Sequence, residues 1–313
     1  MNILIILKVL FFSVTCLAQV EFNWGMLESL EEYEKISTEF KKNIESTTNG
    51  AIRINIKKFK SDPGNPLLEI TDGHLQIYQV PVSLLPNLLP NKNPEWILAW
   101  QLPFLFENKN HVEAYIKSNH SKMRIDSLTS DKILPLTYSY AGGFTAVLSR
   151  RGTNIVDFSD LKFCPFSDFD SSKMNRKSTI KLITSLPCQI LLYELQELFV
   201  FSKNLKKELK VHLTNHHVES RLTFISKDHI AKIPEKYRQE FINKLRNLLD
   251  DERHAIYARS EKNLKLIQID KDIEISHWDL RKRSLAIDDY IKGTSATSKV
   301  FKEEAGFIKN LLK

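Results

Sequence analysis

The sequence predicts an α/β fold, because helical and strand patterns alternate along the chain. Apolar residues recur at helical spacing through 27–46, and 51–59 then alternates apolar and basic residues as a half-buried strand does. A short helix over 67–73 and a second strand over 75–82 follow. Helix, strand, helix and strand at this spacing indicate crossover units on a parallel sheet.

Turn residues separate these elements. Asn49-Gly50 favours the left-handed conformation that ends a helix, and the short helix ends at Gly73. Residues 61–66, SDPGNP, have the composition of a loop.

The rest of the chain continues the alternation. The expected elements are two helices within 109–130, strands over 133–143 and 146–151, a strand near 161–167, helices over 171–185 and 203–210, a strand over 221–226, a long helix from Pro234 to about Asn263, a short strand within 266–276 and helices on both sides of Gly293.

Residues 94–106 are rich in aromatic side chains, among them Trp96, Trp100 and Phe106. A helix that runs into a core loop explains this segment better than a cofactor box, because aromatic side chains dominate core burial.

The first 18 residues have the pattern of a cleaved secretory signal. They contain no acid, one base (Lys8) and an apolar run that is short for a bilayer span. Cys16 and Ala18 are the small residues that precede a signal peptidase cut, so we expect the mature chain to begin at Gln19 and to be periplasmic. The alternatives are an uncleaved anchor, a buried N-terminal strand and a lipid on Cys16.

The composition indicates a globular chain of one large or two ordinary domains. The 313 residues are 42% apolar and 27% charged, with 9 Gly and 11 Pro, which excludes disordered, collagen-like and disulfide-scaffold classes. The net charge of +7 comes from Lys and Arg in short, scattered groups. Nucleic-acid binding needs a clustered basic surface, so no nucleic-acid partner is expected.

Two cysteines, Cys164 and Cys188, remain after the signal segment. They are expected at the starts of two strands on either side of a crossover helix, where adjacent parallel strands are close enough for a disulfide. A bridge and two buried thiols both remain open.

No catalytic or metal motif stands out. GxSxG, GxxxxGK[ST], HExxH and GxGxxG are all absent, so we expect no enzyme activity and no cofactor. His216, His217 and Glu219 form a polar cluster, but adjacent histidines on a strand point to opposite faces, so we favour hydrogen bonding at a strand end for Asn215 and His216 over a metal site. Asp250, Asp251 and Glu252 are interpreted as a solvated helix face.

Several segments in order resemble the extracytoplasmic solute-binding proteins of TRAP transporters, the DctP-like family, of which this chain is identified as a divergent member. The similar segments are FKKNIESTTNGAIRINI (40–56), ITDGHLQI (70–77), LPNLLP (85–90), WQLPFLFENKNHVEAY (100–115), FSDLK (158–162) and LTNHHVESRLTFISKDHIAKIPEKYRQEF (213–241). Single motifs are weak, but their order and spacing over nearly the whole mature chain make the resemblance specific.

The resemblance implies a fold like that of type II periplasmic binding proteins, with two α/β domains joined by crossing hinge strands and a long helix. After a signal peptide over 1–18, domain one is expected at 19–144 plus 222–262 and domain two at 145–221 plus 263–313. The ligand cleft would lie between them and close by hinge motion.

The same resemblance implies where a ligand would bind. The matching positions are Met26, Tyr78, Phe144, Thr145, Cys164, Ser167 and Asn215. Family members typically carry arginines at two of these places, whereas this chain has Phe144 or Thr145 at one and Cys164 or Ser167 at the other. The family's GQEN segment also has no counterpart. An arginine fork grips a carboxylate in a way that a hydroxyl or thiol cannot. Either Arg150, Arg151 or Arg176 replaces the missing arginines, or the pocket takes something other than the usual organic acid.

The implied function is capture of a small-molecule solute and its delivery to the membrane subunits of a TRAP-type permease. The alternative is a protein with the receptor fold that has lost transport and serves as a sensor partner or a protein-binding module.

Overall fold

The computed structural model describes residues 19–27, 31–59, 64–92, 95–102, 105–144, 146–150, 152, 190–192, 209–213, 218–271, 273–277 and 299–311. By compactness the chain divides into two units. Unit 1 comprises 1–79, 130–136 and 223–249, and unit 2 comprises 80–129, 137–222 and 250–313.

A five-stranded sheet in the order β2-β1-β3-β8-β4 contributes β1, β2 and parts of β3, β4 and β8 to unit 1. Its strands are β1 (Val20–Leu27), β2 (Ile52–Phe59), β3 (Ile77–Pro81), β4 (Ile133–Phe144) and β8 (Val218–Ser226). β1 pairs with β2 in parallel from Val20↔Ile52 to Leu27↔Phe59, and with β3 in parallel at Trp24↔Ile77 and Gly25↔Tyr78. This confirms the expected parallel sheet. The chain passes between the units within β3, β4, β8 and α10, and also between residues 129 and 130.

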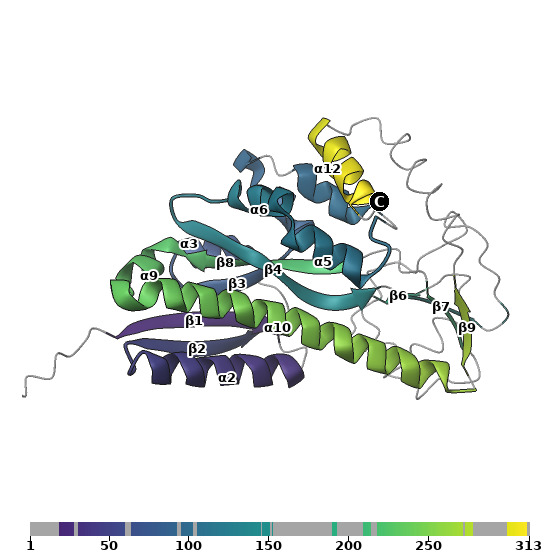
Figure 1. Cartoon of the computed structure of the whole chain (residues 1–313), viewed down its shortest axis with the longest axis horizontal. Helices are drawn as coiled ribbons and strands as arrows, with labels where there is room; N and C mark the ends of the chain where they lie inside the picture. Colours follow the sequence, from purple (N-terminus) through teal and green to yellow (C-terminus); the bar gives the residue numbers. More distant parts are fainter. Residues whose placement is uncertain are drawn as a thin grey trace, which may run out of the picture. The chain divides into compact units, whose positions relative to one another are not determined.

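Capping and turn residues bound several of the helices of unit 1. They are α2 (Glu31–Thr47), α3 (Pro66–Thr71), α9 (Lys227–Lys232) and the first part of α10 (Glu235–Gln268), which Figure 1 shows as one continuous helix. After α2, Asn49 and Gly50 have φ of 49° and 73°. Asn65 caps α3 by accepting from the Leu68 N–H, and Ser226 caps α9 by accepting from the His229 N–H.

Alternate side chains of β1 form the core of unit 1. Val20, Phe22, Trp24 and Met26 are all buried and belong to one apolar cluster with side chains of α2 and α10. The Phe241 ring of α10 lies 5.0 Å from Phe22 and 6.3 Å from Phe40 of α2, centroid to centroid. Burial of one such side chain is worth about 1.5–3 kcal/mol.

Unit 2 contains a smaller sheet and several short helices. The sheet order is β6-β5-β7-β9, from β5 (Ala146–Arg150), β6 (Ile190–Leu192), β7 (Leu209–Leu213) and β9 (Glu274–His277). The helices are η1 (Val82–Leu84), α4 (Leu85–Leu88), η2 (Pro90–Lys92), η3 (Glu95–Gln101), α5 (Lys109–Lys117), α6 (Asn119–Asp126), the remainder of α10 and α12 (Lys299–Asn310).

Packed aromatic rings make the core of unit 2. Trp100 stacks on Tyr138 at 4.7 Å with an interplanar angle of 19°, and it contacts Tyr115 and Phe106 edge-on or tilted. Trp96, Trp100 and Phe106 are all buried. The interpretation of this segment as core is therefore confirmed, although η3 is a 3-10 helix.

Three expectations need correction. β1 was not expected at all, although VEFNW alternates apolar and polar residues, and its last residue, Leu27, takes up the start of the helix expected over 27–46. The long helix reaches Gln268, so it takes up the start of the short strand expected within 266–276. Residues 209 and 210 belong to strand β7 and not to a helix. The expected boundaries of the two domains stay a prediction.

Candidate functional site

The sheet of unit 1 has a topological switch point at β1. The chain leaves β1 through α2 to reach β2 on one side, and then returns through α3 to β3 on the other side. Because parallel crossovers are right-handed, the two opposite directions put α2 and α3 on opposite faces of the sheet. In open α/β sheets, ligands bind outside the carboxyl ends of the strands at such a point.

Tyr78, the second residue of β3, lies beside β1 and is fixed by its neighbours. It pairs in register with Gly25 of β1. A Cβ at position 25 would lie 2.5 Å from Tyr78 Cδ2 and 2.9 Å from Leu75 Cδ1, so only glycine leaves room for the ring. Phe59, at the carboxyl end of β2, contacts Tyr78 edge-on at 6.1 Å. Tyr78 is 1% exposed.

Met26 lies at the carboxyl end of β1 but belongs to the apolar core. It is 4% exposed and part of the cluster formed with α2 and α10. Gly25 and Phe59, which hold Tyr78, were missed from the sequence. A glycine inside a strand is the signal that points to such a close approach.

The other predicted ligand-binding residues are not described in the same detail. Phe144 is the last residue of β4, and its side chain is outside the description. Thr145, Cys164, Ser167 and Asn215 lie outside the described residues, as do Cys188, Arg151 and Arg176. Arg150 ends β5, again without a described side chain. These ligand roles, the substitute arginines and the disulfide therefore stay predictions.

A buried arginine lies in unit 2. Arg253 of α10 is 1% exposed, and its guanidinium donates to both carboxylate oxygens of Glu113, at 2.5 and 3.2 Å, and to Asp250 at 2.8 Å. It also donates to the backbone carbonyl of Tyr138 at 2.7 Å. Burial alone would raise the pKa of Glu113, but the hydrogen bond and charge of Arg253 lower it. The cluster joins α10 to α5 and β4, which is a structural role.

A buried histidine joins three strands of the smaller sheet. His212 of β7 lies 2.8 Å from the Ser149 hydroxyl of β5 through Nε2, and 2.7 Å from the Ser276 hydroxyl of β9 through Nδ1. Burial, and then the charge of Lys210, lower the pKa of His212 to about 4, against an opposing effect of Glu274. The imidazole is therefore neutral at pH 7, so it donates to one hydroxyl and accepts from the other.

The acidic step on α10 is not a uniformly solvated face. Asp251 is exposed and Asp250 is half-exposed and paired with Arg253, but Glu252 is only 2% exposed. The interpretation was wrong for Glu252, because this position faces inward.

Within the part of the chain that the structure describes, no three His, Cys, Asp or Glu side chains come together as metal ligands. His216 and His217 lie outside that part, and Glu219 is in β8. Among the same described residues, no helix combines the length and apolar character needed to cross a membrane.

Comparison with solved structures identifies the fold. A periplasmic solute-binding protein from Shewanella oneidensis, solved with bound succinate, has a TM-score of 0.69 at 15% identity, covering 93% of this chain and all of its own. One from Pseudomonas putida F1, solved with D-glucuronate, has a TM-score of 0.66 at 15% identity. The match covers 93% of this chain and 96% of the other. One from Ochrobactrum anthropi has a TM-score of 0.74 at 12% identity. The match covers 95% of this chain and 97% of the other. All three are TRAP periplasmic solute-binding proteins, so the fold is that of type II periplasmic binding proteins.

A family model matches one segment of the sequence. Residues 27–168 match the DctP model, described as bacterial extracellular solute-binding protein, family 7. The matched segment covers less than half of the chain, and the identity to the solved structures is 12–16%. No curated protein matches it.

Proposed function

We propose that the protein is a periplasmic receptor that captures a small solute by hinge closure and delivers it to the membrane subunits of a TRAP-type permease. The observation that carries this proposal is the agreement between the family match and a fold shared over 91–95% of the chain. Binding and release are the whole activity, so no catalytic step and no cofactor are needed.

The solute is proposed to be small and less acidic than the family's usual ligands. Neighbours were solved with succinate, D-glucuronate and L-malate, all organic acids. This chain has no arginine at Phe144, Thr145, Cys164 or Ser167, where the resemblance expects the carboxylate to be gripped. Without a bidentate fork, a carboxylate loses its strongest directional contact.

The position of Tyr78 supports an aromatic contribution to the site. Tyr78 is the second residue of β3 and pairs with Gly25, two residues before the end of β1, and Gly25 and Phe59 hold its ring. A tyrosine ring has a flat apolar face and one polar end, which suits a sugar-like or partly apolar solute.

A thermal-shift panel tests the proposal. A ligand present at a hundredfold excess over its Kd stabilises the folded state by about 2.7 kcal/mol, which raises Tm by several degrees. We expect no shift with millimolar succinate, L-malate or D-glucuronate and a shift with a neutral or weakly acidic solute, reduced in Tyr78→Ala. A wild-type shift with an ordinary organic acid would refute the altered pocket while supporting the receptor. A flat panel together with a stable protein complex would instead favour a protein-binding module.

A further inference from the structure

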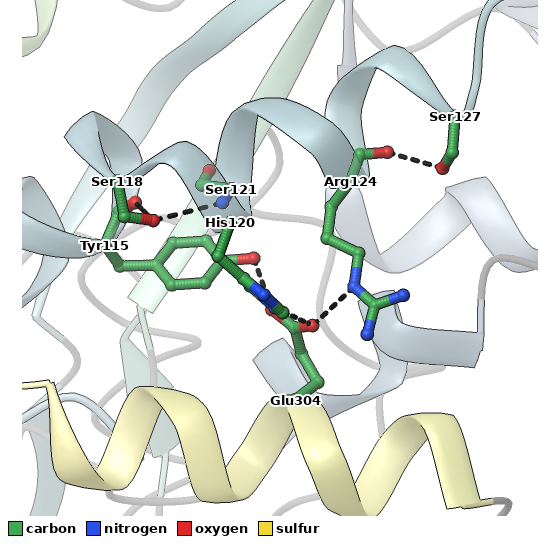
Figure 2. Close-up of polar contacts among 7 residues, drawn as sticks. All are labelled: Tyr115, Ser118, His120, Ser121, Arg124, Ser127 and Glu304. Carbon is green, nitrogen blue, oxygen red and sulfur yellow. Dashed lines mark hydrogen bonds and ion pairs between the residues drawn. The ribbon is translucent and has the colours of Figure 1, made fainter.

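A carboxylate is completely buried in unit 2, on the C-terminal helix α12. Glu304 is 0% exposed and meets three donors from two other helices. The Tyr115 hydroxyl of α5 donates to Oε1 at 2.6 Å, and His120 Nε2 and Arg124 Nε of α6 donate to Oε2 at 2.7 and 2.8 Å. Figure 2 shows the three side chains converging on Glu304 from α5 and α6.

Two serine side chains form hydrogen bonds with the backbone beside the donors on α5 and α6. Ser118, between the helices, caps α6 by accepting from the Ser121 N–H at 3.0 Å, and its hydroxyl donates to the Tyr115 carbonyl at 2.7 Å. Ser127 donates to the carbonyl of Arg124 at 2.6 Å (Figure 2). These hydrogen bonds at and near the corner between α5 and α6 involve no residue of α12.

α12 makes further contacts beside this carboxylate. The Phe307 ring stacks on His120 at 4.0 Å and meets Tyr115 edge-on at 6.3 Å. His111 Nε2 lies 2.6 Å from the Ile308 carbonyl, while its Nδ1 accepts from the Glu107 N–H. The carbonyl oxygen cannot donate, so His111 is the donor to α12.

The donor set has the composition of a carboxylate receptor site. A buried carboxylate is tolerated only when its charge is paired and its oxygens accept hydrogen bonds, and here one cation, one imidazole and one phenol supply both. Burial chiefly raises the pKa of Tyr115, and the negative charge of Glu304 adds to the rise, so the phenol stays a donor. His120 and Arg124 are each about a quarter exposed, which leaves the site reachable from solvent along one edge.

We propose that Tyr115, His120 and Arg124 form a carboxylate-binding site in which Glu304 is the resident ligand that docks α12. A small free monocarboxylate takes its place when the Glu304 side chain is cut back. The site belongs to unit 2 and does not depend on the proposed transport function.

Chemical rescue tests this site. Glu304→Ala removes the atoms that acetate would replace, so the variant melts several degrees below wild type and sodium acetate restores part of the loss with a saturable dependence. Sodium chloride at equal ionic strength and neutral acetamide give no such recovery. The matched control is Glu303→Ala, one residue away, exposed and paired only with Lys299 in the described residues; its Tm does not respond to acetate beyond the chloride effect.

The donors are tested in the same background. Adding Arg124→Gln to Glu304→Ala abolishes the acetate response. The proposal is overturned if chloride raises the Tm of Glu304→Ala as much as acetate does. It is also overturned if acetate raises the Tm of Glu303→Ala, or of the double variant that lacks Arg124, by an equal amount. If Glu304→Ala does not fold, a double-mutant cycle between Glu304→Gln and Arg124→Gln decides, because the Tm losses must be non-additive if the two groups bind each other, and additive losses overturn the proposal.

Discussion

The ring of Tyr78 lies so close to Gly25 that a methyl group at position 25 would come within 2.5 Å of its Cδ2 atom. The two residues face each other across the β1–β3 pair, at the switch point of the sheet. Leu75 closes the same space from another side. Gly25 therefore determines where the ring of Tyr78, the aromatic candidate for the solute site whose side chain is described, can lie.

Gly25→Ala should lower the free energy of unfolding by about 1–3 kcal/mol, since the ring and Leu75 must shift to admit the methyl group. Denaturant unfolding of wild type and variant measures this change in the free energy of unfolding. Gly306→Ala in α12 is the control, because nothing lies within 4 Å of that position and alanine is favoured in a helix by about 1 kcal/mol. Equal effects of the two substitutions would contradict the packing argument.

Arg253→Met should destabilise the protein by about 3–5 kcal/mol, because Glu113 would keep a largely buried charge without its partner. Arg246→Met, at an exposed position of the same helix, should cost less than about 1 kcal/mol. Urea unfolding of both variants makes the comparison. Similar losses would show that the ion pairs of Arg253 contribute no more than a surface charge does.

Acid should destabilise the protein through His212. Its folded pKa of about 4 lies below the usual 6.5, so the unfolded chain binds more protons between these values. The contribution of neutral His212 to the free energy of unfolding is complete above pH 6.5 and is lost as the pH falls to about 4. At about 1.4 kcal/mol per pH unit, the loss amounts to about 3 kcal/mol.

Measurements of unfolding free energy from pH 7 to pH 4 in wild type and His212→Gln check this. The variant should lose that part of the pH dependence, while His74→Gln, at an exposed position, should keep it. An unchanged pH slope in His212→Gln would refute the assignment.

The mature chain should begin at Gln19. The apolar run and the small residues before it predict cleavage after Ala18. Intact-mass analysis of protein recovered from the periplasm gives the answer, and a mass that retains Met1 or an acyl group on Cys16 would be incompatible with it.

The sequence predicted the local structure where periodicity and turn residues agree. The strand over 51–59, the stop at Asn49-Gly50 and the helix before Gly73 all depend on near neighbours, and all are confirmed. β1 was missed because its alternating segment follows directly on the apolar N-terminal run, which masks where a new element begins. Glu252 was misplaced because helix position alone does not show which face a neighbouring element covers.

The candidate site depended on contacts that no local pattern encodes. Tyr78 was proposed from a resemblance, but the need for Gly25 and Phe59 beside it arises only when three strands come together. The donors to Glu304 lie some 180 to 189 positions away in the sequence. Such partners share no periodicity, so they become visible only in the folded chain.

Native mass spectrometry of the exported protein tests the receptor function most directly. A receptor that binds its solute tightly should retain it through gentle purification, so the native mass should exceed the polypeptide mass by one small molecule. Denaturation should release that molecule for identification, and the Tyr78→Ala protein should carry less of it. A native mass equal to the bare chain, unchanged after incubation with a broad panel of solutes, would contradict solute capture.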